Sequence, residues 1–321
     1  RVYIKNKKKY KEKEKKMDSK KTGKKIETRG RKPKIHVAPV IPPKIFDQSI
    51  DDYLLRAVSR DGCNFKVLID TLKSTLTEVS LTFSNEGIKM TAVDTNGSSV
   101  VYITILQSSF EEYFCERPLK IGIDIEKLHK TLKTSKSNND MTWIISKKRP
   151  DYIEIMFRNY IKGTETTDLI KLLDLEESEL IDELSYPKMV EVDSQMMQSI
   201  CREMASIKAT MIKISRKNKN LVFENMNGNV FRKVSLELDV RSVDDVDDDD
   251  DDDTEGVFLL KPLKSFSKAA SLTPKVKIYL RKNELDEDGL KMKRFPFVCE
   301  YDISGFGVLR YILGQQNPDT M

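Results

Sequence analysis

Lysine and arginine side chains recur along one side of four stretches of this chain that have the apolar spacing of helices. The stretches lie near residues 63–76, 124–134, 194–207 and 259–271, in the same order in each half. Side chains three, four or seven residues apart share one helix face, so each stretch would present a positive row opposite its apolar stripe. Four such rows favour a polyanionic partner, and the phosphate backbone of a nucleic acid is the simplest one. The candidate cations are Lys66, Lys73, Lys130, Lys133, Arg202, Lys261, Lys264 and Lys268.

The residue types in these rows indicate which kind of nucleic acid they suit. Lysine is a compact point charge that binds phosphate oxygens and reads bases poorly. Aromatic side chains, which stack on the bases of single strands, are not interleaved with the cations. The rows therefore predict binding of duplex DNA without regard to its sequence. A single row is more often an ordinary solvated helix face, so the prediction depends on the repetition.

Residues that could perform catalysis or bind a metal are sparse. His36 lies in a basic N-terminal segment, and His129 lies between lysines of the second stretch, where an exposed side chain is expected. No group of His and Cys has the spacing of metal ligands, and no phosphate-binding loop or nucleophile motif occurs. We therefore expect no catalytic residue, no metal site, no cofactor and no enzymatic activity.

An aspartate run at residues 244–253 allows a different interpretation. A DNA-processing enzyme could use such carboxylates with a metal ion. An uninterrupted run, however, lacks the spaced ligands and the turn glycine of a calcium loop. Repulsion between like charges favours a disordered, solvated loop instead.

Charge divides the chain into two unlike parts. Residues 1–44 contain 18 Lys and Arg against 4 Asp and Glu, whereas the remainder contains 38 against 47. The first part, with a net charge of +14, is predicted to be a disordered basic tail. Within it, Arg29 to Lys34 resembles an AT-hook, a short basic segment that binds the A·T minor groove. The remainder, with a net charge of −9, would repel DNA unless its cations gather on one surface.

The cysteines and the hydropathy of the chain indicate its environment. No pair has CxxC spacing, which is typical of reduced, mostly buried thiols in a cytosolic or nuclear protein. No run of 18 apolar residues occurs, so no membrane-spanning segment is expected. The N-terminus lacks the apolar region of a secretory signal. The cysteines are Cys63, Cys115, Cys201 and Cys299.

Alternating apolar runs between the helices predict antiparallel strands in both halves. Asn85 to Gly87 is a predicted tight turn, and Asp124 is the predicted N-cap of the second helix. Corresponding helices lie about 130–135 residues apart, which indicates a duplicated domain. The predicted strands are 79–83, 88–92, 100–106, 141–146, 152–158, 210–215, 220–224, 230–238, 275–281, 296–302 and 308–313.

These patterns predict a domain organisation for the whole chain. An acidic, leucine-bearing segment at 171–187 is expected to connect the two domains. The tail would occupy residues 1–44, the first domain 45–170 and the second domain 188–316, with the acidic loop 244–253 inside the second.

Five segments, in this order, resemble the DNA sliding clamps of the proliferating cell nuclear antigen type, which are processivity factors of DNA polymerases in cells and in large DNA viruses. The resemblance covers about residues 45–316. The segments are GIKMTAVDTNGSSVVYITI (87–105), FEEYFCER (110–117), LIKLLDLEESEL (169–180), SICREM (199–204) and PFVCEYDISGFGVLRYIL (296–313).

The resemblance implies an α+β fold with two similar domains of the DNA-clamp type. Antiparallel sheets would lie outside, and two helices from each domain would line a ring closed by three subunits. All of the candidate cations except Lys264 match positions that line the pore of the family. A clamp of this kind encircles duplex DNA, is placed there by a clamp loader, and recruits polymerases, nucleases or ligases. The expected location is the nucleus or a viral replication factory in the cytoplasm.

The resemblance also implies a pocket for a short partner peptide that carries a glutamine and two aromatic residues. Gln315 and Gln316 replace the apolar, proline-containing end of the family beside this pocket. Some of the matching apolar residues could instead be ordinary core. The matching residues are Val93, Ser98, Val100, Leu180, Phe295 and Pro296.

The segment expected to form one edge of the subunit interface departs from the family. Asp168, within residues 163–169, stands where the family usually carries an aromatic residue. It could pair with Arg232 or Lys233 on the partner edge, near residues 229–233, or it could weaken the trimer. A monomeric clamp-fold protein and a subunit of a hetero-oligomeric ring therefore remain alternatives.

Overall fold

The computed structural model describes residues 50–60, 62–94, 96–134, 139–175, 189–217, 219–238, 253–285 and 292–317. The predicted basic tail, most of the predicted acidic loop and most of the predicted connector lie outside these residues, as does Leu180. No helix in the described ranges has both the length and the apolar character needed to cross a bilayer.

Within its described residues, the first half combines two α-helices with nine strands. Its elements are η1 (Ile50–Asp52), β1 (Tyr53–Ser59), α2 (Cys63–Leu72), β2 (Glu78–Ser84), β3 (Gly87–Val93), β4 (Ser99–Leu106), η2 (Gln107–Ser109), β5 (Glu112–Cys115), β6 (Leu119–Asp124), α3 (Ile125–Lys133), β7 (Asp140–Ser146), β8 (Arg149–Asn159) and β9 (Thr164–Lys171).

The second half repeats the combination of two helices with antiparallel strands, as the sequence pattern predicted. Its elements are β10 (Met189–Asp193), α4 (Ser194–Ser206), β11 (Met211–Lys217), β12 (Asn220–Asn225), β13 (Lys233–Glu237), β14 (Thr254–Leu259), α5 (Leu260–Phe266), η4 (Ser267–Ser271), β15 (Lys275–Tyr279), β16 (Glu284–Leu285), β17 (Met292–Lys293), β18 (Phe297–Ile303) and β19 (Gly307–Leu313).

Side-chain caps explain where two of the helices begin. Asp124 accepts a hydrogen bond from the backbone N–H of Lys127 at 3.0 Å, which confirms the predicted N-cap of α3. Asp193 does the same at the start of α4, accepting from Met196 N at 2.8 Å. Such caps satisfy backbone donors that have no partner within the helix.

The stretch predicted as one helix at 259–271 is instead a short α-helix, α5, followed by the 3-10 segment η4. The amide of Gln198 on α4 donates to the carbonyl oxygen of Ser267 at 2.9 Å. The amide of Gln195 donates to that of Ala270 at 3.0 Å. Side chains of a neighbouring helix thus supply partners for carbonyls that continued α-helical bonding would otherwise use.

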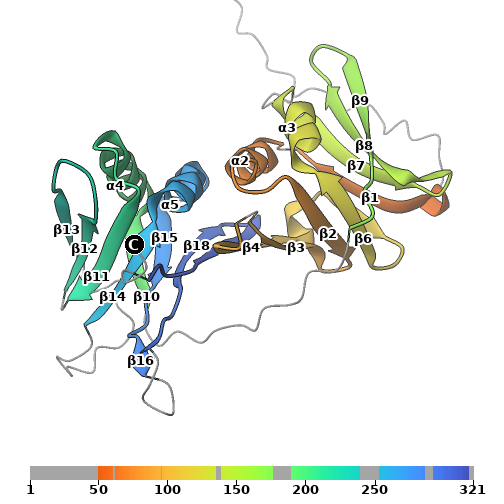
Figure 1. Ribbon diagram of the computed structural model, residues 1–321. Helices are drawn as coiled ribbons and strands as arrows, with labels where there is room; N and C mark the ends of the chain where they lie inside the picture. Colours follow the sequence, from red (N-terminus) through yellow and green to blue (C-terminus); the bar gives the residue numbers. More distant parts are fainter. Residues whose placement is uncertain are drawn as a thin grey trace, which may run out of the picture. The chain divides into compact units, whose positions relative to one another are not determined.

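All sheets are antiparallel, and one of them crosses both halves (Figure 1). The first half contributes a five-stranded sheet in the order β5-β1-β7-β8-β9, and the second half a four-stranded sheet in the order β13-β12-β11-β14. The eight-stranded sheet has the order β10-β15-β18-β19-β4-β3-β2-β6, so β4 of the first half pairs with β19 of the second. Strands β16 and β17 form a separate hairpin.

The halves also share a hydrophobic core. Phe306, in the turn between β18 and β19, places its ring 4.9 Å from that of Phe65 on α2. Phe65 also lies 5.6 Å from Trp143 and 5.7 Å from Phe110, both in the first half. An aromatic residue of the second half therefore completes the core of the first, and buried aromatic area of this kind resists separation of the two.

The helices form one continuous row that spans both halves. Helix α3 contacts α2, α2 contacts α5 and η4, and these two elements contact α4. Figure 1 shows α2 beside α3 and α4 beside α5. The apolar side of each helix is buried, including Leu68 and Leu72 of α2 and Leu128 and Leu132 of α3. The polar sides of the helices therefore remain exposed along the row.

Alanine at Gly87 and at Gly97 separates a steric cost from a conformational one. Both glycines have positive φ angles, of 129° and 67°. A Cβ at Gly87 would lie 2.0 Å from the carbonyl oxygen of Ile105, whereas one at Gly97 would meet nothing within 4 Å. We expect Gly97→Ala to lower the free energy of unfolding by about 1 kcal/mol and Gly87→Ala by about 3 kcal/mol or more. Urea unfolding followed by the fluorescence of Trp143 measures both, and equal losses would contradict the steric argument.

Candidate nucleic-acid interface

The structure places the eight predicted cations along the row of helices. Lys66 lies on α2 and Lys73 is its C-cap residue, while Lys130 and Lys133 lie in the last turn of α3. The second half supplies the other four from α4, α5 and η4. All of them are exposed except Lys66, which is half-buried. The four cations of the second half are Arg202, Lys261, Lys264 and Lys268.

Cations from the two halves come close enough to act on the same groups. Lys268 of η4 and Lys73 of α2 both lower the pKa of the Asp70 carboxyl, mainly through a hydrogen bond from Lys73. The two lysines therefore lie on a common surface around Asp70, although they are far apart in the sequence. This placement agrees with the contacts of η4 with α2.

The cations differ in whether a carboxylate neutralises them. Lys73 pairs with Asp70 at 2.7 Å, and Lys130 pairs with Glu126 at 2.7 Å, an interaction that raises the pKa of the Lys130 ammonium group. In the part of the chain that the structure describes, the other exposed cations of the row have no carboxylate within 4 Å. They can bind phosphate without first breaking an ion pair, which favours electrostatic binding of a polyanion. These cations are Lys133, Arg202, Lys261, Lys264 and Lys268.

His129 lies between two of the helices and is not the exposed residue that the sequence pattern suggested. Its side chain is only 15% exposed. The Nε2 atom lies 3.1 Å from Asp70 Oδ1 and 2.9 Å from Lys73 Nζ. Sequence reasoning missed this cluster because Asp70 and His129 are 59 residues apart. Among the described residues, no group of His, Cys, Asp and Glu is arranged to hold a metal ion.

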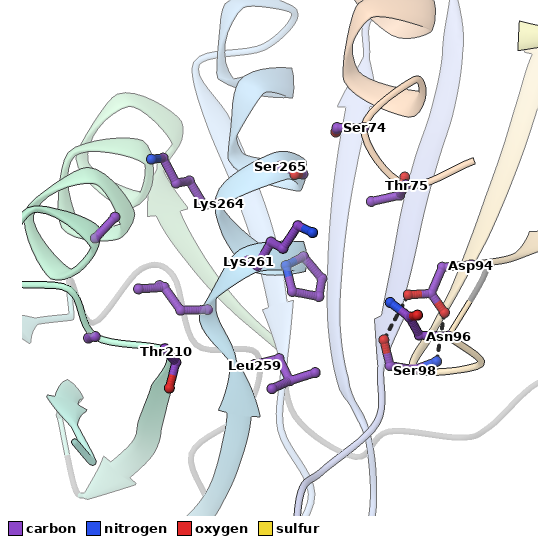
Figure 2. A pocket seen from close by; sticks show the side chains of 14 residues that line it. Ser74, Thr75, Asp94, Asn96, Ser98, Thr210, Leu259, Lys261, Lys264 and Ser265 are labelled. Carbon is purple, nitrogen blue, oxygen red and sulfur yellow. Dashed lines mark hydrogen bonds between the residues drawn. The ribbon is translucent and has the colours of Figure 1, made fainter. Parts of the chain in front are cut away.

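A cavity of about 470 Å³ lies where the turn between β3 and β4 approaches α5. Figure 2 shows Lys261 and Lys264 on one side and Asp94, Asn96 and Ser98 on the other. The Asp94 carboxylate accepts hydrogen bonds from Ser98 N at 2.6 Å and Ser98 Oγ at 2.7 Å. These bonds fix the turn, so one wall of the cavity is rigid.

Three of the residues predicted to bind a partner peptide lie at or beside the paired ends of β3 and β4. Val93 pairs with Val100, and Val100 pairs in turn with Ile312 of β19. Val93 is 43% exposed, while Val100 and Ile312 are half-buried, so the three form an accessible apolar strip on one side of the sheet. Ser98 lies in the turn beside this strip. Sequence reasoning did not select Ile312, which belongs to the strip through the register of β19.

Phe295 and Pro296, also predicted for the peptide pocket, directly precede β18. Phe295 is buried, with the Arg281 guanidinium 4.0 Å from its ring centroid, so it supports the surface from below. Pro296 is half-buried. The side-chain amide of Gln315 donates to the carbonyl oxygen of Phe295 at 2.7 Å, which holds this segment against the C-terminal residues.

Strands β9 and β13 are two of the strands that end the described sheets, so their outer backbone groups pair with no described strand. Exposed apolar residues stand at the turns beside them: Ile161, 81% exposed, near β9, and Phe231, 74% exposed, near β13. An exposed edge with adjacent apolar side chains is a template for pairing with another chain. Asp168 of β9 is half-buried and pairs across the ladder with Ile155.

The predicted partners of Asp168 on the β13 side are already engaged within the chain. Arg232 donates from its guanidinium to the carbonyl oxygen of Glu203 at 2.9 Å. Lys233 forms an ion pair with Glu224 at 2.9 Å. A salt bridge from Asp168 to either cation in another copy would therefore share or replace these interactions.

Family models and known proteins match nearly the whole described part of the chain. The model of the N-terminal domain of proliferating cell nuclear antigen matches residues 54–180, and that of the C-terminal domain matches residues 180–316. A protein named "Probable DNA polymerase sliding clamp 1", from Paramecium bursaria Chlorella virus 1, is 26% identical over 266 residues, covering 82% of this chain and 97% of that protein. Proliferating cell nuclear antigen 2 of Drosophila melanogaster is 26% identical over 255 residues, covering 79% and 94%.

The fold agrees with this match. The crystal structure of proliferating cellular nuclear antigen from Entamoeba histolytica superimposes with a TM-score of 0.71, covering 83% of this chain and 100% of that one at 21% sequence identity. This likeness confirms the predicted clamp fold, and the two family models together span both halves. The chain belongs to the proliferating cell nuclear antigen family.

Proposed function

We propose that this protein is a DNA sliding clamp, a non-enzymatic processivity factor that encircles duplex DNA and holds a DNA polymerase and other replication proteins on it. The observation that supports this function most directly is the row of helices with exposed cations that have no carboxylate partner among the described residues. Relatives that match over nearly their whole length are named as sliding clamps or proliferating cell nuclear antigens. The residues proposed to contact DNA are the eight predicted cations.

Encirclement requires a closed assembly, and we propose a homotrimer formed by pairing β9 of one copy with β13 of the next. Both edges are open in the described chain, and both adjoin exposed apolar side chains. Such a contact joins two different surfaces, so it is head-to-tail, and it closes into a ring when the rotation between copies allows. A monomeric clamp-fold protein or a subunit of a hetero-oligomeric ring is the alternative.

Partner proteins are proposed to dock a short peptide on the strip formed by Val93, Val100 and Ile312, beside Ser98 and Pro296. The strip is apolar and accessible, which suits aromatic anchors of a peptide. DNA without an accessible end cannot thread a closed ring, so loading there requires a clamp loader that opens the ring, whereas a short linear duplex can enter through its end. The protein would act in the nucleus or in a cytoplasmic viral replication factory, wherever its polymerase works.

Neutralising one cation on each of three helical elements tests the DNA contact. We expect the triple variant Lys133→Gln, Arg202→Gln, Lys268→Gln to bind duplex DNA more weakly. The slope of log affinity against log salt should flatten by about 2 to 3, since each phosphate contact contributes about 0.9. Fluorescence anisotropy with a labelled duplex at several salt concentrations measures both effects.

The control for charge alone is the triple variant Lys89→Gln, Lys147→Gln, Lys275→Gln, in which the exposed lysines lie on strands or their turns. It removes the same net charge from surfaces outside the helical row. If both triple variants flatten the slope equally, the helical row is not the DNA contact.

An aspartate in place of Phe231 tests the ring. Buried aromatic anchors contribute about 2 kcal/mol or more to an interface, so each contact should weaken about thirtyfold. We expect light scattering to give about three times the 37.0 kDa chain mass for the parent protein and a concentration-dependent loss of that mass for Phe231→Asp. Leu285→Asp changes another exposed side chain, 62% exposed and outside both edges, and should stay trimeric. A parent that is monomeric at all concentrations would contradict the proposed ring.

An aspartate at Ile312 tests the docking strip. A charge there would place an unpaired carboxylate under the aromatic anchors of a bound peptide, so affinity should fall at least about tenfold. Val308 lies four residues earlier on β19, is also half-buried, and pairs with Thr104 away from the strip. Polarisation of a fluorescent peptide with one glutamine and two aromatic residues compares Ile312→Asp with Val308→Asp. Equal losses would indicate general damage rather than a docking site.

A further inference from the structure

Asp70, Lys73 and His129 form a closed cluster on the helical row. Lys73 Nζ lies 2.7 Å from Asp70 Oδ1, His129 Nε2 lies 3.1 Å from the same oxygen, and Lys73 Nζ lies 2.9 Å from His129 Nε2. Lys73 is one of the cations that the proposed function places against DNA. The cluster therefore connects a lysine of the proposed DNA contact with an imidazole, a group that can be neutral or positively charged.

The three contacts cannot all be favourable hydrogen bonds at once. Each imidazole nitrogen carries either a proton or a lone pair in the ring plane. When Nε2 carries a lone pair, it accepts from the Lys73 ammonium group and has nothing to donate to Asp70. When Nε2 carries a proton, it donates to Asp70 and can no longer accept from Lys73. A protonated Nε2 and the Lys73 ammonium group therefore cannot keep their present separation of 2.9 Å, because two donors would face each other beside Asp70.

When the ring that has its lone pair on Nε2 gains a proton there, the arrangement reverses, while the carboxylate itself stays charged. The hydrogen bond from Lys73 lowers the pKa of Asp70, and the charges of Lys73, Lys268 and His129 lower it further. Asp70 is consequently ionised throughout the range of about pH 5 to 8 in which imidazole groups titrate. A doubly protonated His129 would bind Asp70 as an ion pair and repel the neighbouring ammonium group.

The other charged groups around His129 are mostly cationic. On its own helix, Glu126 is paired with Lys130, and Lys133 lies one turn further along. Lys268 of η4 helps to lower the pKa of the Asp70 carboxyl. Lys66, which is half-buried, lies four residues before Asp70 on α2. On the far side of α3, Asp168 and Lys171 of β9 line a groove with Lys127 and Lys130. An incoming phosphate would therefore be the strongest new negative charge near the cluster.

We propose that His129 is a positioning residue for DNA binding: its protonated ring takes over Asp70 and releases Lys73 to a phosphate, so that the clamp takes up a proton when it binds duplex DNA. This inference rests on the proposed function. Nearby phosphate groups favour the charged form of an imidazole, which is the form that frees Lys73. The DNA-bound state then holds more protons than the free state. By reciprocity, the affinity for duplex DNA is highest at a pH below the range in which imidazole groups titrate, and it falls as the pH rises through that range.

Proton uptake by His129 can be detected by NMR, because His36 and His129 are the only histidines of the chain. In the full-length His36→Gln protein, the single imidazole signal in an NMR titration belongs to His129. We expect saturating duplex DNA, added at constant pH near 7, to shift this signal toward the imidazolium position. An unchanged protonation state on saturation would overturn the proposal.

Binding measured at pH 6 and pH 8 at constant salt gives the second readout. We expect the parent and the His36→Gln control to bind a labelled duplex about fivefold tighter at pH 6, a coupling of ordinary size. In His129→Gln the ratio should fall to about one, because glutamine can accept from Lys73 but cannot become charged. In Asp70→Asn, which removes the charge that holds Lys73, affinity at pH 8 should rise toward the parent value at pH 6. A ratio that persists in His129→Gln would overturn the proposal.

These outcomes also separate this inference from the function on which it rests. If the parent binds duplex DNA with a salt slope that depends on Lys133, Arg202 and Lys268, but His129 gains no proton, only the present inference fails. If the parent fails to bind duplex DNA at either pH, the proposed function fails, and the inference fails with it. The trimer mass of each variant shows whether its fold is intact.

Discussion

The pairing of β4 with β19 is the interaction on which the arrangement of the molecule depends. It joins strands of the two halves in one ladder, from Ser99 opposite Leu313 to Ile105 opposite Gly307. Phe306 adds a buried aromatic contact across the same junction. Because close-packed cores and backbone ladders resist deformation, the helices of both halves keep fixed positions relative to each other. Without this junction, the candidate cations of the two halves would lie on two separate surfaces.

The balance of charge differs between strands and helices. Several lysines on strands or their turns have a carboxylate partner, whereas five exposed cations of the helical row have none among the described residues. The net negative charge of the body is therefore compatible with DNA binding, since these five cations are gathered on the helical row and, among the described residues, are not neutralised by a carboxylate. Lysine contacts to phosphate carry no information about bases, so each register along the duplex is equivalent. The paired lysines on strands or their turns are Lys89, Lys147, Lys213, Lys217, Lys233 and Lys277.

Local patterns could be predicted from the sequence, whereas features that depend on distant residues could not. The extent of α3 follows from its apolar spacing and the cap at Asp124, which act within a few residues. The 3-10 form of η4 depends on side-chain amides of α4. The low exposure of His129 depends on its contact with Asp70 of another helix. The place of Ile312 beside Val100 depends on the register of two strands that are distant in the sequence. The DNA contacts and the peptide contacts stay predictions. The first follow from the positions of cations on helix faces, and the second follow from the family resemblance.

The open edges β9 and β13 have a consequence for assembly beyond the choice of partner. Because the two edges differ, a head-to-tail assembly always has one unpaired β9 edge and one unpaired β13 edge, unless its last copy pairs with its first to close a ring. Whether that happens is decided by the rotation between the edges, and that rotation is transmitted through the sheet containing β4 and β19. In the proposed ring, a small change in the twist at this junction would convert the closed assembly into a growing helical filament. The stiffness of the β4–β19 pair would thus limit the size of the proposed assembly.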